Sequence, residues 1–201
     1  MGRRKGGLNF RRKKTHISTS HVSEAFAYIF SVVAAIGLAL FIVSNWGIKT
    51  SVIGSSMEPY LYNGQTIYIS KLSYLISKPR SGDIIVFLPN GNKNTHFYIK
   101  RVVGVPGDVV EFRNGRLYVN DVEEVDPKID KAQDAGIAEN AITLGVDEYF
   151  VLGDNRNNGE DSRSGNIGPV KFDLIEGRAW FKTTMDDSIA GVIPRGKKKA
   201  D

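Results

Sequence analysis

The sequence contains no cysteine and only three histidines, which are His16, His21 and His96. The absence of cysteine excludes disulfide bonds, thiolate metal sites and a cysteine nucleophile. So small a number of histidines argues against a multi-histidine zinc centre, and we expect no metal and no cofactor. Any catalytic chemistry in this chain would therefore use hydroxyl, carboxylate, amine or single-histidine side chains.

Basic charge is concentrated at one end of the chain. The whole protein carries a net charge of +5, but residues 1–14 hold seven lysines and arginines and no acidic residue. The rest of the chain therefore carries a net charge of −2. A surface that binds nucleic acid would place its basic residues on the folded body, so this distribution argues against a nucleic-acid partner.

One long apolar run lies near the N-terminus. Residues 25–43 contain no charged side chain. As a helix they would span about 28 Å, close to the roughly 30 Å hydrocarbon core of a membrane. No A-x-A cleavage site follows the run, and Trp46 suits a membrane interface. We therefore predict a retained transmembrane helix over residues 25–46.

The basic residues also predict the orientation of this helix. Seven lysines and arginines precede the apolar run, whereas only Lys49 lies close behind it. Positive charges beside a membrane span stay on the cytoplasmic side. We expect a single-pass protein of the plasma membrane with a cytoplasmic N-terminus over residues 1–24. An extracytoplasmic domain would follow over residues 47–182, and a disordered basic tail over residues 183–201.

Short alternating apolar segments dominate the chain after the predicted helix. They predict a mostly β, antiparallel and barrel-like domain. The expected strands are residues 66–70, 83–88, 96–105, 108–113, 116–120, 148–153 and 176–181. Asn114-Gly115 is typical of a type I′ hairpin turn. Residues 126–140 are rich in Asp, Lys and Ala and are expected to form a loop or a short surface helix.

Two residues of this domain could act as the base for a serine nucleophile. His96 is the only histidine after the apolar run, but the sequence has no G-x-S-x-G elbow, and a lone strand histidine is usually structural. Lys100 lies in an apolar strand, where burial would lower the pKa of its amine. Most strand lysines face solvent, so spacing alone leaves this choice open.

Four segments follow one another in a specific order behind the apolar run. They are residues 54–59 (GSSMEP), 80–87 (RSGDIIVF), 98–108 (YIKRVVGVPGD) and 153–163 (GDNRNNGEDSR). In this order they resemble the boxes of bacterial type I signal peptidases, in the single-span form typical of Gram-positive bacteria. The resemblance covers about residues 23–182.

The resemblance implies a membrane-anchored serine endopeptidase with a Ser-Lys dyad. Ser56, directly before Met57, matches the family nucleophile in preference to Ser55, and Lys100 matches the general base. The backbone N–H of Ser56 would be one oxyanion donor. Gly54 stands where some members supply a second donor from a serine hydroxyl, so the second donor stays open.

The resemblance also implies supporting residues and reveals two departures. The supporting residues are Arg101 paired with Asp154, Asp161 paired with Arg163, and the adjacent Ser162. Tyr60 stands where the family usually has threonine, and Gly159 where a serine hydroxyl usually orients the lysine. We expect Gly159 to reduce the precision of Lys100 without abolishing activity, and a serine restored there should not lower turnover.

The implied reaction is the removal of N-terminal signal peptides from exported preproteins. Its partners would be membrane lipid and preproteins with small residues at positions −1 and −3, bound as an extended strand. A membrane-anchored β-domain that binds peptides without cleaving them is the alternative that the two departures leave open. A self-cleaving repressor would need a soluble DNA-binding domain in place of the apolar run. Oligomeric state stays open.

Overall fold

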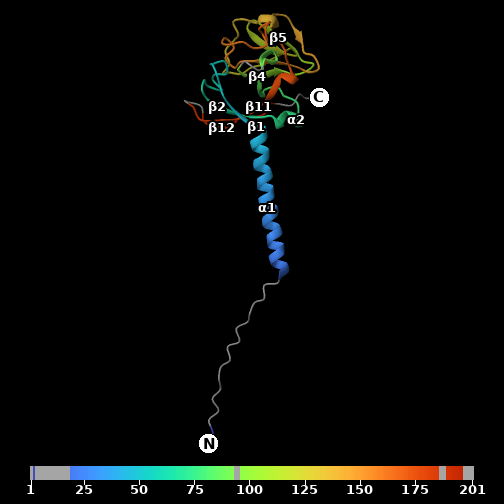
Figure 1. The fold of residues 1–201 in the computed structure, drawn as a ribbon. Coiled ribbons are helices and arrows are strands. Elements are labelled where there is room, and N and C mark those ends of the chain that lie inside the picture. Colours follow the sequence, from blue (N-terminus) through green and yellow to red (C-terminus); the bar gives the residue numbers. More distant parts are fainter. Residues whose placement is uncertain (1, 3–18, 93–95, 186–188, 197–201) are drawn as a thin grey trace. The chain divides into compact units, whose positions relative to one another are not determined.

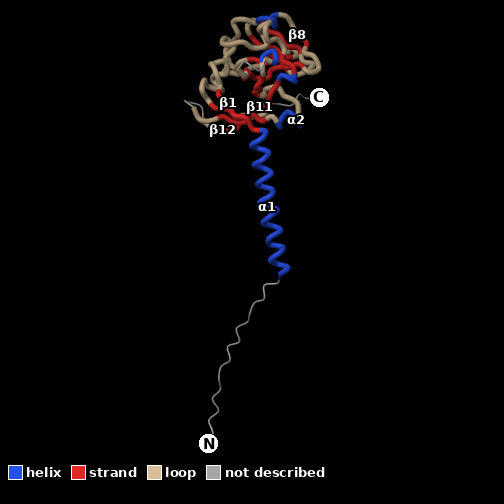
Figure 2. Tube along the Cα trace, in the orientation of Figure 1, coloured by secondary structure: helices blue, strands red, loops and turns tan. Residues whose placement is uncertain are grey.

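The chain divides into two compact units. The computed structural model describes residues 2, 19–92, 96–185 and 189–196. The units are Met1–Asn45 and Trp46–Asp201. Figures 1 and 2 show one long helix in the first unit, and mainly strands and loops in the second.

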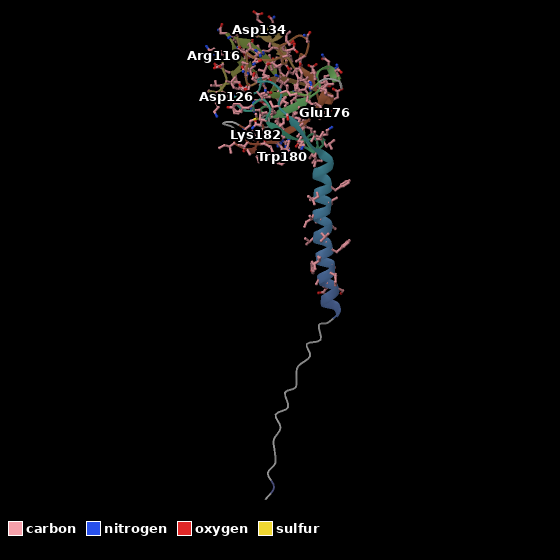
Figure 3. All side chains as sticks on the ribbon, turned by 60° about the vertical axis from the view of Figure 1, so that its left-hand side comes forward. Arg116, Asp126, Asp134, Glu176, Trp180 and Lys182 are labelled. Carbon is pink, nitrogen blue, oxygen red and sulfur yellow. The ribbon has the colours of Figure 1, made fainter. Side chains whose placement is uncertain are left out.

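The first unit is built on helix α1, Thr19–Trp46, which begins six residues before the predicted span. Within it, Ser23–Phe41 has a mean hydropathy of 2.0, and every side chain is exposed. Figure 3 shows these side chains standing off the helix on several sides. The helix is therefore long and apolar enough to cross a membrane. The interfacial side chain expected at Trp46 and most of residues 1–24 lie outside the described part of the chain.

The second unit contains a large antiparallel sheet with the strand order β1-β2-β11-β3-β4-β9-β10, and β12 pairs with β11. The bounds are β1 Gly47–Ser51, β2 Thr66–Ser70, β3 Ile84–Phe87, β4 Tyr98–Gly104, β9 Glu148–Leu152, β10 Val170–Lys171, β11 Ile175–Lys182 and β12 Gly191–Val192. Register shifts along β11 and between β4 and β9 allow the sheet to curl into a half-barrel.

A smaller antiparallel sheet has the order β7-β6-β5-β8. Its strands are β5 Val109–Arg113, β6 Arg116–Val119, β7 Val122–Glu123 and β8 Ile142–Thr143. Asn114 and Gly115 join β5 to β6 with φ values of 51° and 75°. Positive φ at both central residues defines a type I′ turn, so the predicted hairpin is confirmed.

Helices in the second unit are short. They are α2 Leu72–Ile76 and the 3₁₀ turns η1 Pro89–Gly91, η2 Gly136–Glu139 and η3 Phe172–Leu174. The segment 126–140 forms a loop that ends in η2, as expected. The predicted fold class, mostly antiparallel β behind one apolar N-terminal helix, is confirmed.

Strand β4 is positioned by two different neighbours. Strand β3 pairs with it from Phe87↔Tyr98 to Ile84↔Arg101. On the other edge β9 pairs with it only from Arg101 onward, starting at Leu152. Residues 98–100 therefore have no strand partner on that edge among the described residues.

The expected disordered tail is wrong for residues 183–185 and 189–196. Gln65 Nε2 donates to the carbonyl of Thr183 at 2.6 Å, and Ile193 is 5% exposed within a core cluster. Gly196 N–H donates to Asp83 Oδ1 at 2.8 Å. Basic composition suggested a tail, but the apolar Ile193 and the small Gly196 allow the chain to return against the sheet.

Candidate active site

The turn that carries Ser56 is anchored on both sides by buried apolar residues. Val52 and Met57 are 3% and 1% exposed and belong to one core cluster. Between them, Gly54 has a φ of +81°, which glycine adopts without strain, and its N–H donates to Asn63 Oδ1 at 2.9 Å. The turn leaves Ser56 half-buried on the wall of a cavity.

The loop that follows β9 holds this turn at two successive residues. Asn155 N–H donates to the carbonyl of Ser56 at 3.0 Å, and Asn158 Nδ2 donates to Ser55 Oγ at 2.6 Å. Gly153 packs so closely here that a Cβ on it would lie 2.6 Å from the Ser56 carbonyl oxygen. The sequence did not predict these contacts, and the place of the two asparagines in the fourth box was their only signal.

Lys100 lies within β4 and is 3% exposed. Its register partner on β3 is the fully buried Ile85. Burial lowers the pKa of the Lys100 amine to about 8, against the opposing effect of the Asp161 carboxylate. No described residue accepts a hydrogen bond from Nζ. A usable fraction of this amine is therefore neutral near neutral pH, as a general base requires.

Gly159 marks the point at which the Ser56 hydroxyl and the Lys100 amine meet. A Cβ built on Gly159 would lie 3.7 Å from Ser56 Oγ and 3.4 Å from Lys100 Nζ. The two groups therefore border the same small volume. The same Cβ would lie 2.9 Å from Ser56 Cβ, and the φ of Gly159 is +87°. This geometry changes the expectation for a restored serine, because any side chain at position 159 is strained and presses on Ser56.

A cavity of about 280 Å³ opens beside Ser56 and Lys100. Ser56, Lys100 and Gly159 line it together with Ile53, Phe97 and further residues of the first, third and fourth boxes. The exposed His96 also lines it.

A larger cavity of about 740 Å³ lies on the Arg101 side of β4, where Tyr60, Val103 and Val105 contribute to its wall. Its lining includes neither Ser56 nor Lys100. Cavity size alone would therefore have selected a place away from this chemistry.

Arg101 and Asp154 form a bidentate ion pair, in which the aspartate is buried and the arginine is half-buried. Nε and Nη2 of Arg101 each donate to one Asp154 carboxylate oxygen at 2.7 Å, and Nη1 donates to the Gly82 carbonyl at 3.0 Å. Asp154 is 1% exposed. The pKa of Arg101 is raised although burial opposes this, because the hydrogen-bonded carboxylate favours the charged form. The pair joins β4 to the segment after β9.

Asp161 and Arg163 form the second predicted pair. Nε and Nη2 of Arg163 donate to the two Asp161 carboxylate oxygens at 2.9 Å each. Arg163 also donates to the carbonyls of Asp134 and Arg156 at 2.8 and 2.6 Å. Ser162, fully buried between them in sequence, accepts from Val151 N–H at 2.9 Å and so attaches this loop to β9.

Tyr60 has its own partners in this chain. Its hydroxyl donates to Asp126 Oδ2 at 2.6 Å, and the Arg101 guanidinium lies 4.9 Å from the centre of its ring. Burial and the Asp126 carboxylate raise the pKa of Tyr60 to about 12. Lys182 Nζ donates to the Tyr60 carbonyl at 2.9 Å, and Figure 3 labels both Asp126 and Lys182. Tyr60 therefore places its ring against Arg101, the basic member of the Arg101–Asp154 pair, from the segment that follows Ser56.

Comparison with known proteins finds one matching family, described as signal peptidase, peptidase S26, over residues 25–184. Signal peptidase I P of Bacillus subtilis subsp. natto is 34% identical over 160 residues, which is 75% of this chain and 84% of the relative. A signal peptidase I of Bacillus amyloliquefaciens is 33% identical over 178 residues, which is 85% of this chain and 91% of the relative.

A further relative and a solved structure carry the same description. Signal peptidase IB of Staphylococcus aureus strain Mu50 is 32% identical over 178 residues, which is 79% of this chain and 89% of the relative. The crystal structure of a signal peptidase I from Enterococcus faecalis V583 is 35% identical, with a TM-score of 0.42. The match covers 51% of this chain and 97% of the Enterococcus faecalis chain.

Proposed function

Because the chain belongs to the signal peptidase family S26, we propose that it is a membrane-anchored serine endopeptidase that removes signal peptides from exported preproteins. The observation that carries this proposal is the meeting of the Ser56 hydroxyl and the buried Lys100 amine beside Gly159. A lysine whose pKa is lowered by burial can act as the base that this serine requires.

The proposed reaction begins with neutral Lys100. Its amine accepts the hydroxyl proton of Ser56, and Oγ attacks the carbonyl carbon of the scissile peptide bond. The backbone N–H of Ser56 donates to the oxyanion of the tetrahedral intermediate. The C–N bond then breaks, and the leaving amine takes the proton from Lys100. Water, activated by the same lysine, hydrolyses the ester and releases the signal peptide with a free carboxylate.

An extended peptide is the substrate form that suits this cavity. On the β9 side, residues 98–100 of β4 have no strand partner within the described part of the chain. A substrate strand can therefore pair with them there. In an extended peptide the side chains at positions −1 and −3 point to the same face. Both would enter a cavity of about 280 Å³ that also holds the dyad, which favours small side chains at the two positions.

Membrane anchoring would bring enzyme and substrate together. In this proposal α1 crosses the membrane, residues 1–24 stay in the cytoplasm, and the catalytic domain 47–182 lies outside. The apolar stretch Ser23–Phe41 and the seven basic residues before it support this topology. A preprotein held in the same membrane meets the site at a raised effective concentration without further contacts.

Cleavage of a preprotein in proteoliposomes tests the proposed function. The full-length protein should release a mature product that begins directly after a small −1 residue, as identified by mass spectrometry. Phenylalanine at position −1 of the substrate should block release, and Ser56→Ala should abolish it. Continued processing by Ser56→Ala would make the proposal untenable. In spheroplasts, external protease should digest the catalytic domain and spare an N-terminal tag.

A non-catalytic, membrane-anchored peptide-binding domain is the second candidate. Gly159 and Tyr60 favour it, because both depart from the residues usual at these positions in the family. One measurement separates the two candidates: a non-catalytic binding domain would bind signal peptides and release no cleavage product.

A further inference from the structure

We propose that the Ser55 hydroxyl is the second oxyanion donor and that Asn158 is the residue that positions it. The inference rests on the proposed peptidase function. Oxyanion sites of acyl-transfer enzymes combine aligned donors at the developing charge. The Ser56 N–H supplies one such donor, and the question is which group supplies the other.

Gly54 is not suited to this task. It has no side chain, and its N–H already donates to Asn63 Oδ1 at 2.9 Å. Its φ of +81° makes glycine the residue that fits without strain, although a Cβ there would meet no atom within 4 Å. A hydroxyl at position 54 would therefore require a change in the backbone that now orients the turn.

Ser55 has the hydroxyl that Gly54 lacks. It lines the cavity of the dyad and directly precedes the Ser56 N–H, so its side chain is joined to that donor by a short covalent path. Its Oγ accepts from Asn158 Nδ2 at 2.6 Å. A hydroxyl that accepts one hydrogen bond still has its own proton to donate. Because the amide occupies one side of Oγ, that proton is directed away from Asn158.

Tyr98 carries the other non-nucleophilic hydroxyl among the residues that line this cavity. It donates to Glu160 Oε2 at 3.4 Å, so its proton is already used. Asn158 belongs to the loop whose Asn155 N–H binds the Ser56 carbonyl. One loop therefore holds both Ser56 and Ser55 by hydrogen bonds, which fixes the Ser55 hydroxyl relative to the Ser56 N–H.

Turnover of variants is the first test. We expect Ser55→Ala to lower kcat by about 10²-fold, the usual effect of removing one oxyanion donor, with KM changed less than about twofold. Ser55→Thr keeps a hydroxyl and should recover most of the loss. Asn158→Ala should lower kcat by a smaller factor, and the double variant should be no slower than Ser55→Ala because Asn158 acts through Ser55. Ser51→Ala, at an exposed serine of β1, is the matched control.

Inhibitor binding separates a catalytic from a structural role. A peptide aldehyde forms a tetrahedral adduct with Ser56, so its affinity should fall in Ser55→Ala by the same factor as kcat. An uncleavable peptide with proline at position +1 should bind Ser55→Ala as tightly as the wild type. Equal loss of affinity for both ligands, or a lower melting temperature that accounts for the loss, would overturn the role of Ser55.

The same set of variants distinguishes this inference from the proposed function. Wild-type kcat in Ser55→Ala, together with inactive Ser56→Ala and Lys100→Ala, would overturn the second donor and leave the peptidase standing. An active Ser56→Ala would overturn the proposed function itself. Loss of activity in Ser55→Ala with retention in Ser56→Ala would assign the nucleophile to Ser55 and overturn both statements.

Discussion

Lys100 and Arg101 are consecutive residues of β4, yet their surroundings are opposite. Lys100 is buried beside Gly159 with no described hydrogen-bond acceptor, and burial lowers the pKa of its amine. Arg101 donates to both oxygens of Asp154 and to the carbonyl of Gly82. The Lys100 amine has no hydrogen-bond acceptor among the described residues, whereas Nε, Nη1 and Nη2 of Arg101 each have one. The difference agrees with the proposal that Lys100 acts as the base while Arg101 fixes the position of the strand.

Removing the partner of Arg101 should have the largest effect on stability. Asp154→Ala leaves a guanidinium without its carboxylate in a buried site, so we expect a loss of about 3–5 kcal/mol in the free energy of unfolding, measured by denaturant titration. Glu176→Ala is the matched control, because its ion pair with Lys71 is 30–39% exposed. An exposed pair should contribute less than about 1 kcal/mol. Equal losses in the two variants would remove the distinction between the two kinds of pair.

Replacing Lys100 should have the opposite sign. Its pKa is about 8 in the folded protein and 10.5 ordinarily, so burial of the charge opposes folding fully below pH 8. This cost disappears as the pH rises from 8 to 10.5, because the folded state loses the proton first. Lys100→Met should therefore gain about 3 kcal/mol of stability at pH 6 and less at pH 10.

Two observations complete the Lys100 prediction. The stabilised Lys100→Met protein should show no peptidase activity, and Lys49→Met, at an exposed position of β1, should change stability little at either pH. If Lys100→Met were less stable than the wild type at pH 6, burial of the charged Lys100 amine would not oppose folding.

A substitution in the C-terminal segment should have a smaller, purely steric effect on stability. A Cβ on Gly196 would lie 2.2 Å from the Ser81 carbonyl oxygen and 2.7 Å from Asp83 N. Gly196→Ala should therefore cost about 1–3 kcal/mol, the usual range for overpacking. Gly191→Ala meets no atom within 4 Å and serves as the control. Equal melting temperatures for the two variants would show that the segment is not held against the sheet.

Gly159 gives the smallest and most specific test. Gly159→Ala and Gly159→Ser impose the same Cβ on Ser56 and the same positive φ, with a cost of about 1–2 kcal/mol. Both should turn over more slowly than the wild type. The difference between their turnover rates isolates the effect of the hydroxyl. If Gly159→Ser is faster than Gly159→Ala, the serine hydroxyl orients Lys100. Identical rates would show that this site works without an orienting hydroxyl at position 159.

The local sequence pattern predicted the longer strands but missed β1 and the two-residue strands. All seven predicted segments are strands whose ends differ from the prediction by at most two residues. Strand β1, Gly47–Ser51, was missed because its sequence GIKTS has little apolar alternation, and it forms through its pairing with β2. The two-residue strands β7, β8, β10 and β12 depend in the same way on a partner.

The candidate site was predictable only where residue identity carries the information. The boxes indicated Ser56 and Lys100, and the alternation of β4 indicated that Lys100 and Arg101 point to opposite faces. The contact of Asn158 with Ser55 and that of Tyr60 with Asp126 join residues far apart in the chain. Such contacts follow from the tertiary arrangement of loops, which no local pattern contains.

The pH dependence of kcat/KM for preprotein cleavage tests the Ser56–Lys100 pair most directly. If neutral Lys100 is the base, activity should rise along an acid limb with an apparent pKa of about 8, the value to which burial lowers this amine. Lys100→Ala should abolish cleavage at every pH. Activity that persists in Lys100→Ala and is lost in His96→Ala would contradict the dyad and assign the base to the histidine on the cavity rim.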